Sequence, residues 1–346
     1  MDEFPPPLRV LQLILAGFCL FLVLFGLIIF ILPQEFFSVP AVVLDNTSSG
    51  LPPLTVSRTF AFQNGTETVT IDVSGSVWAA SKKTHRSLLL FGDQKTAGVR
   101  YYRAMIDDPS QDRIYRDLID RFRTIRAVRN LTDDEYLELI SAYVQSIPYK
   151  DGGNMPPKYP AELLVENMGD CDDKSILIAG LLAREGYTVA LLKFGPEQHM
   201  AMGIGSDAFP YKATGYTYLE GMTPAFVGSP TAHLQIPLNS DPLVLPISTG
   251  TKVYRSGNET HFISETAAAA RQREKELTAR LDAFPLSGKD GEEYRAVLRE
   301  RDRSAAIRSY ILSHPYDRPG TYAYLQREMK NETGLSPSAE PAGTGG

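Results

Sequence analysis

Apolar residues run without a break in one segment near the start of the chain. Between Arg9 and Glu35 the sequence carries no charged residue. Roughly 23 apolar residues precede Pro33, enough at about 1.5 Å per residue to cross a hydrocarbon layer of about 30 Å. This pattern predicts a transmembrane helix over residues 10–32. A cleaved signal peptide is the alternative, but its apolar run would be shorter, and only Val39 to Ala41 resembles a cleavage site.

Alternating apolar and polar positions follow a stretch rich in Pro, Ser and Val. The segments TVSRTFAF and TETVTIDV alternate with a period of two around Asn64-Gly65, which predicts a β-hairpin. We expect β-structure from residue 54 to about 80, with Trp78 packed on this β layer. The runs RSLLLFG and GVRYYRAMI extend the strand-like character as far as Ile106.

Helical spacing of apolar residues begins at Asp112. The segment RIYRDLIDRFRTI places four apolar side chains on one stripe, namely Ile114, Leu118, Ile119 and Phe122. Thr132 to Glu135 form a capping box that opens a second helix. This second helix is expected to end before Pro148, where a Pro/Gly-rich loop leads to a short helical piece.

The segment GDCDDKSILIAGLLAREG, residues 169–186, joins an acidic start to an apolar body. Residues 175–182 are apolar nearly all round, which predicts a buried helix that ends at Gly186. The segments YTVALLKF, HMAMGIG and YTYLEGM then read as three strands separated by turns.

Beyond Pro224 the chain has three segments that differ in composition. From Pro224 to about Gly257 it is rich in Pro and Gly and has little periodicity of its own. A charged helical region runs from Ser264 to about Tyr324, and its polar faces suit a helical pair packed on the main domain or on a partner. The tail GLSPSAEPAGTGG is disordered by composition.

The charged residues of the chain exclude one class of partner and indicate how the chain would be oriented in a membrane. The net charge is −6 and no cluster of Lys and Arg is interleaved with aromatics, so nucleic acid is not an expected partner. Arg9 flanks the apolar run on one side, and no Lys or Arg follows on the other until Arg58, which places the N-terminus in the cytoplasm. Sequons beyond the run support a glycosylated extracytoplasmic face; they begin at Asn46, Asn64, Asn130, Asn258 and Asn331.

Two cysteines are present, and Cys19 lies inside the apolar run. Cys171 opens the buried helix, where unpaired N–H groups favour a thiolate, with Asp170 as the helix cap. His199 lies in the second of the following strands and could return to the helix mouth as a base. Glu220, on the next strand, could orient that base. The backbone N–H of Cys171 could donate to an oxyanion.

Simpler interpretations apply to the same residues. A cysteine in an apolar helix is usually a packing residue, and a single histidine is more often structural than catalytic. The three aspartates lack the spaced oxygen ligands of a calcium loop, and no second cysteine or paired histidine provides a zinc site. No cofactor and no metal are therefore expected.

The run from YKDGGNMPPKYPAELL through GDCDDKSILIAGLLAREG to HMAMGI and YTYLEGMTP resembles the transglutaminase-like superfamily, in particular its archaeal and bacterial membrane-associated members. The resemblance covers about residues 131–224. It implies an α+β, papain-like core with Cys171 as nucleophile, His199 as base and Glu220 as the third member. Animal transglutaminases have Asp at that last position and lack the GDCDD form, so the resemblance gives no warrant for protein crosslinking.

These observations predict a membrane-anchored enzyme that acts on amide or peptide bonds through a thioester, with hydrolysis favoured over crosslinking. Its substrate would be a protein or peptide, with a cell-envelope component as a candidate, and its membrane contact would be residues 10–32. The alternative is a non-catalytic binding or scaffolding module on a protease-like fold. The sequence does not indicate an oligomeric state.

The predicted divisions of the chain are an anchor at 1–34, a stalk at 35–53, a β-rich region at 54–108, a transglutaminase-like catalytic domain at 109–260, helices at 261–330 and a disordered tail at 331–346.

Overall fold

The protein is a mixed α+β structure. The computed structural model describes residues 6–31, 40–44, 50–86, 93–153, 155–229, 237–285, 289 and 291–333. Its helices are α1 (Pro6–Ile31), α2 (Gly75–Lys83), α3 (Gln94–Ile106), the 3-10 helix η2 (Pro109–Gln111), α4 (Asp112–Arg129), α5 (Asp133–Gln145), α6 (Pro160–Glu166), α7 (Cys171–Arg184), α8 (Gly257–Asp282), α9 (Glu292–Ser313) and α10 (Arg318–Thr333). Its strands are β1 (Leu54–Phe62), β2 (Gly65–Val73), β3 (Val189–Phe194), β4 (His199–Gly205), β5 (Tyr216–Leu219) and β6 (Leu243–Ser248).

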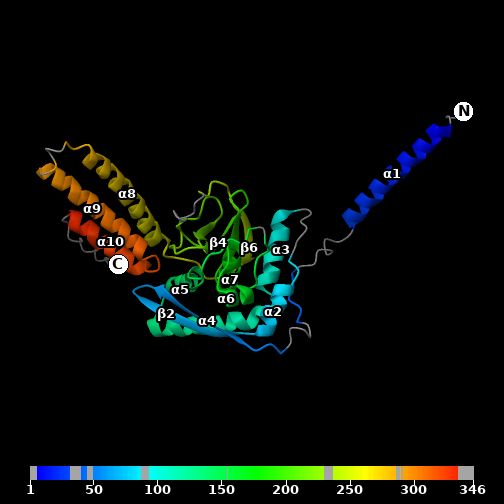
Figure 1. Ribbon diagram of the computed structural model, residues 1–346, viewed down its shortest axis with the longest axis horizontal. Helices are drawn as coiled ribbons and strands as arrows, with labels where there is room; N and C mark the ends of the chain where they lie inside the picture. The colour runs from blue at the N-terminus through cyan, green and yellow to red at the C-terminus, as the bar shows by residue number, and fades with distance from the viewer. Residues whose placement is uncertain are drawn as a thin grey trace, which may run out of the picture.

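A four-stranded antiparallel sheet forms the centre of the fold, in the order β5-β4-β3-β6 (Figure 1). The nearly all-apolar helix α7 packs on β3 and β4, as its buried body requires. The three predicted strands β3, β4 and β5 are therefore confirmed. Gly186, the predicted end of the helix, has φ of 84° just after the last helical turn.

Strand β6 is a departure from the sequence prediction, which gave this segment no regular structure. It contains Pro246, which pairs with Ala190 beside a register shift in β3. Because proline cannot donate to a ladder, it is tolerated where a strand has a free side, and β6 is the edge of this sheet. The Pro/Gly-rich surroundings thus concealed a strand.

The predicted hairpin is confirmed. β1 and β2 pair from Leu54↔Val73 to Phe62↔Gly65, and Gln63 and Asn64 form the turn. The side chains of Val69, Ile71 and Val73 alternate into the core, where β2 contacts α4. The predicted stripe of α4 is buried, and most residues of α5 are buried as well. The capping box at Thr132 and Glu135 is formed.

The strand prediction for GVRYYRAMI was wrong, because these residues form the C-terminal part of α3. Asp93 caps this helix by accepting from the backbone N–H groups of residues 95 and 96. Its buried residues are Tyr101, Tyr102, Met105 and Ile106, and this helical spacing explains why the helix is favoured. Helix α2 likewise replaces the expected end of the β region, and Trp78 lies on it, partly buried. Residues 87–92, from the run RSLLLFG, lie outside the described residues.

Helix α7 crosses α4 at a very short distance. A Cβ added to Gly180 would lie 2.3 Å from Tyr115 Oη and 2.5 Å from the ring carbon Cε1. Tyr115 is fully buried, and the guanidinium of Arg184 lies 3.9 Å from its ring centre. Only glycine therefore permits this helix approach.

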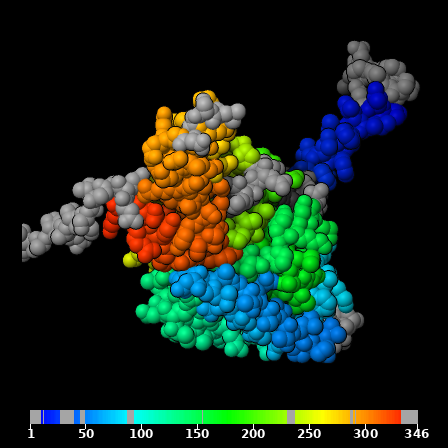
Figure 2. All heavy atoms as spheres, turned by 60° about the vertical axis from the view of Figure 1, so that its left-hand side comes forward, coloured from blue at the N-terminus to red at the C-terminus, as the bar shows by residue number. Residues whose placement is uncertain are grey.

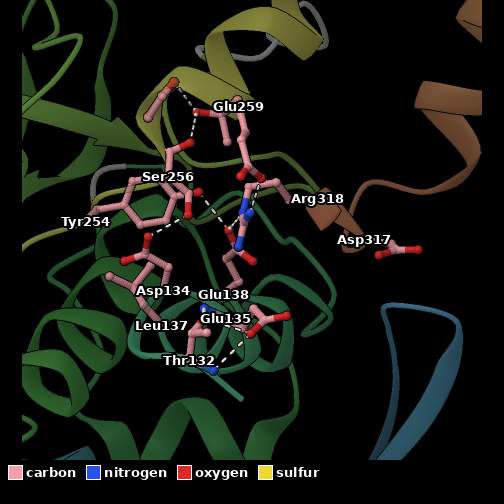
Figure 3. Close-up of polar contacts among 12 residues, drawn as sticks. Thr132, Asp134, Glu135, Leu137, Glu138, Tyr254, Ser256, Glu259, Asp317 and Arg318 are labelled. Atoms are coloured by element: carbon pink, nitrogen blue, oxygen red, sulfur yellow. Dashed lines mark hydrogen bonds and ion pairs between the residues drawn. The ribbon is translucent and has the colours of Figure 1, made fainter. Parts of the chain in front are cut away.

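The charged C-terminal region is helical, as predicted, and comprises α8, α9 and α10. Figure 2 shows these helices seated against the β1–β2 hairpin, where Gln63 N–H donates to the carbonyl of Tyr316 at 3.0 Å. Figure 3 shows Arg318 between Glu138 of α5 and Glu259 of α8. Of the two predicted alternatives, the helices thus pack on the main domain.

The apolar run near the N-terminus forms helix α1, which stands apart from the other elements in Figure 1. Among the residues that the structure describes, no helix is both long enough and apolar enough to cross a membrane. Residues 35–39 and 45–49 of the predicted stalk (35–53), and residues 334–346 of the predicted tail (331–346), lie outside the described residues. Residues 331–333, predicted as part of the disordered tail, instead belong to α10.

Candidate active site

The three predicted site residues lie at the ends of neighbouring elements. Cys171 is the first residue of α7 and is 8% exposed, and His199 is the first residue of β4 and is 7% exposed. Glu220 follows the last residue of β5 and is fully buried. Helix α7 packs on β4, so the elements that carry the thiol and the imidazole are in contact.

The strand register brings His199 and Glu220 onto one face. Met202 pairs with Leu219, and continuing this antiparallel register places Glu220 opposite Ala201, diagonal to His199 on the same face. Such diagonal neighbours are within reach of long side chains. His199 Nε2 lies 3.3 Å from Glu220 Oε2, so the predicted pairing of imidazole and carboxylate is present.

A tyrosine hydroxyl contacts both members of this pair. Tyr218 donates its hydroxyl hydrogen to Glu220 Oε2 at 2.6 Å, and the same oxygen lies 3.1 Å from His199 Nε2. The other carboxylate oxygen of Glu220 accepts from the backbone N–H groups of Gly221 at 2.9 Å and Met222 at 2.8 Å. Burial raises the pKa of Glu220, but the interaction with His199, with these donors, outweighs it and holds the pKa below its usual value. Glu220 is therefore an ionised carboxylate near neutral pH.

The face of β4 that carries His199 is apolar. Its neighbours include the rings of Phe194 and Tyr218, and a small apolar cluster, which includes Ala201, covers this side of the sheet. Both faces of β4 are buried. The imidazole therefore lies in an aromatic enclosure rather than at an open surface.

The environment of Cys171 differs from the one predicted. Burial raises the pKa of its thiol well above the usual value, and the negative charge of Asp172 raises it further, although the backbone N–H of Met200 lowers it. The thiol donates to Asp172 Oδ1 at 3.6 Å. Among the described residues, no hydrogen bond joins the thiol to His199. We expected the helix N-terminus to lower the thiol pKa. Instead the pKa is raised, because burial and the adjacent carboxylates outweigh the effect of the helix N-terminus.

The aspartates beside the cysteine have local structural roles. Asp170 Oδ1 accepts from the backbone N–H groups of Asp172 and Asp173 at 3.1 Å, and Asp173 Oδ2 accepts from the backbone N–H of Asp170 at 3.1 Å. This reciprocal capping box confirms Asp170 as the helix cap. Burial and the charge of Asp170 raise the pKa of Asp173 to about 7. Asp172 Oδ2 accepts from the hydroxyl of Tyr102 at 3.0 Å.

Two residues behind the site were not identified from the sequence. Lys174 is fully buried, and its ammonium donates to the carbonyls of Met222 at 2.9 Å and Gln145 at 3.3 Å. Burial lowers its pKa to about 8, against the opposing charge of Glu220. Gln145 donates to the carbonyl of Glu220 at 2.7 Å. Together they fix the turn after β5. The available signal was a lysine at the start of the apolar body of the helix.

Within the described residues, no group of three or more His, Cys, Asp or Glu side chains is arranged to hold a metal ion. The chain matches no protein-family model. No curated protein and no solved structure gives a match. The resemblance to the transglutaminase-like superfamily thus remains a prediction, carried by the segment around Cys171 and by the positions of His199 and Glu220.

Proposed function

We propose that this chain is a transglutaminase-like cysteine hydrolase that cleaves amide or peptide bonds, with Cys171 as nucleophile, His199 as general base and Glu220 as the carboxylate that orients the base. The observation that carries the proposal is the state of the imidazole. His199 Nε2 is engaged by Tyr218 and lies 3.3 Å from Glu220, whereas Nδ1 makes no hydrogen bond among the described residues. A base with one nitrogen held and the other free is what an adjacent nucleophile requires.

The reaction follows from the protonation states. Because the thiol pKa is raised, Cys171 rests as a thiol, and His199 Nδ1 must take its proton as the sulfur attacks the substrate carbonyl. The carbon–nitrogen bond then breaks, the departing amine receives that proton from His199, and a thioester remains. Water, deprotonated by His199, attacks the thioester and releases the acid and the thiol. The backbone N–H of Cys171, at the start of α7, would donate to the oxyanion in both steps.

The test is site-specific alkylation of Cys171 by iodoacetamide near neutral pH, followed by a screen of peptide and glycopeptide amides. Cys171→Ser should abolish turnover while the fold persists, since the side chains are similar in size but the hydroxyl is far harder to ionise. His199→Ala should slow both reactions by roughly 100-fold or more. Glu220→Gln should retain more activity because it removes no proton carrier. Equal alkylation rates for wild type and His199→Ala would refute the assignment of the base.

A binding or scaffolding module on a protease-like fold is the second candidate. It is favoured by the hydrogen bond from the Cys171 thiol to Asp172 and by the raised thiol pKa, which suit an inert packing residue. The two candidates differ in one measurable property. An inert thiol would react slowly with iodoacetamide, at a rate that rises steadily with pH as the thiolate fraction grows and that does not depend on His199. A catalytic thiol would react faster near neutral pH, and this reactivity would be lost in His199→Ala.

We also propose that the chain is anchored in a membrane, with the N-terminus in the cytoplasm and the bulk of the protein outside. The uncharged apolar run and the sequons beyond it support this placement. Of the sequon asparagines, Asn64, Asn130 and Asn258 have described side chains, and all three are exposed. Exposure is what glycan attachment at these positions would require.

A further inference from the structure

The hydroxyl of Tyr218 contacts both the histidine and the carboxylate of the candidate site. It lies 2.6 Å from Glu220 Oε2 and 3.1 Å from His199 Nε2. The direct distance between His199 Nε2 and Glu220 Oε2 is 3.3 Å. The three atoms therefore form a triangle, in which His199 Nε2 faces both the tyrosine oxygen and the carboxylate oxygen.

The direction of these hydrogen bonds is fixed by chemistry. A phenol has one proton to donate, and an ionised carboxylate can only accept. Tyr218 thus donates to Glu220, and its oxygen must accept from His199 Nε2–H. This order places the proton of neutral His199 on Nε2 and leaves the lone pair on Nδ1.

Burial holds Tyr218 in this arrangement. Its side chain is fully buried, and its ring lies 6.4 Å from that of Phe194 and 5.3 Å from that of Tyr211, between ring centres. Burial and the charge of Glu220 raise the pKa of its hydroxyl well above the usual value, so the phenol keeps its proton across the working pH range.

We propose that Tyr218 is a positioning residue for His199, which links the imidazole to Glu220 and selects the tautomer with a free Nδ1. This inference rests on the proposed function. When Nδ1 takes the thiol proton, the imidazolium still donates from Nε2 to Tyr218, and Tyr218 still donates to Glu220. No proton moves along this chain. Tyr218 also weakens the electrostatic attraction between Glu220 and the imidazolium, because its hydrogen bond to the carboxylate partly compensates the negative charge.

Removing the hydroxyl has a defined consequence. In Tyr218→Phe the carboxylate loses a donor, and Glu220 Oε2, at 3.3 Å, becomes the sole acceptor for His199 Nε2–H. A less compensated carboxylate stabilises the imidazolium more strongly, so alkylation of Cys171 should begin to rise at a higher pH. In Glu220→Gln the charge is lost, so the rise should begin at a lower pH. The two variants therefore shift the pH dependence of alkylation in opposite directions.

Other titratable groups near the site are retained in both variants. They come from each element around the imidazole: Cys171, Asp172 and Lys174 of α7, Lys193 of β3, Tyr149 in the loop after α5, Tyr102 of α3, and Tyr211 before β5. Burial lowers the pKa of Lys174 to about 8 and the charge of Glu220 opposes this; Lys174 keeps that charge beside it in Tyr218→Phe but loses it in Glu220→Gln.

The experiment measures the pH dependence of iodoacetamide alkylation of Cys171 in the full-length chain solubilised in detergent. Peptide mass spectrometry separates Cys171 from Cys19. Tyr211→Phe is the matched control, because its ring packs on Tyr218 but its hydroxyl contacts neither Glu220 nor His199. The rate should rise as His199 loses its proton. Tyr218→Phe should move this rise upward by about half a pH unit or more.

The control should leave the rise in place, and Glu220→Gln should move it downward. In the Glu220→Gln background, Tyr218→Phe should cause no upward shift, since no charge remains to be unmasked. The inference is overturned if Tyr218→Phe matches Tyr211→Phe while His199→Ala still slows alkylation. If His199→Ala has no effect, the proposed function itself fails.

Discussion

The ion pair of Arg318 with Glu138 gives a prediction whose size can be worked out from the structure. The side chains of Arg318 and Glu138 are 6% and 12% exposed, and Nε lies 2.6 Å from Oε1. Arg318→Met keeps most of the apolar stem but leaves Glu138 with a single partner, the hydroxyl of Tyr254 at 2.6 Å. Figure 3 shows this carboxylate on α5, facing Arg318.

Removing one member of a buried pair costs about 3–5 kcal/mol, because the other charge stays buried without compensation. Because the hydrogen bond from Tyr254 is retained, we expect a loss near the lower end of this energy range. The second partner, Glu259, has a side chain that is 35% exposed and adds little. We expect a loss of about 3 kcal/mol, which lowers Tm by roughly 6 °C or more.

Thermal unfolding followed by circular dichroism measures this loss. Arg273→Met is the matched control, because Arg273 pairs with Glu300 on the surface, each side chain 48% exposed. The control should lose less than about 1 kcal/mol.

The loss in Arg318→Met should also depend on pH. Burial raises the pKa of Glu138, and the charge of Arg318 opposes this rise, so the substitution raises the pKa further. A carboxyl group with a raised folded-state pKa binds protons more tightly when folded, so stability is recovered as the pH falls through that pKa. The deficit should therefore shrink between about pH 7 and pH 5. A Tm equal to that of the control, or a deficit that grows on acidification, would refute the reasoning.

Three further results are expected. Gly180→Ala should destabilise the fold by about 1–3 kcal/mol in urea unfolding, because overlap with the buried ring of Tyr115 outweighs the gain in helix propensity of about 1 kcal/mol; equal or greater stability would contradict the close helix contact. Asp172→Asn should lower the thiol pKa of Cys171, since a charge that raises it is removed, and alkylation at pH 8 should become faster; a slower rate would contradict the assignment of that charge. Protease added outside intact cells should digest the chain from Asp45 onward and leave the extreme N-terminus protected; a tail protected until the membrane is broken would reverse the orientation.

Several elements could be predicted from short stretches of sequence because their causes are local. The hairpin forms around Asn64 as expected, although its turn residues are Gln63 and Asn64, and the capping boxes at Thr132 and Asp170 open α5 and α7 at the expected residues. The apolar body of α7 and the three strands after it were predicted in order. Because that order brings His199 and Glu220 onto one face of an antiparallel sheet, the pairing of these two residues also followed from the sequence.

Other features depend on contacts between distant segments. The apolar residues of α3 suit a strand as well as a helix over a short window, and packing decided for the helix. Strand β6 forms because the edge of the sheet accepts Pro246.

The protonation of the candidate site was decided in the same way. A helix N-terminus favours a thiolate, but burial and Asp172 raise the pKa of Cys171 instead. The sequence by itself determined which residues meet, because turns, caps and periodicity act over a few neighbours. Only the tertiary structure decided their charge states, because the burial that sets them comes from segments far apart in the chain.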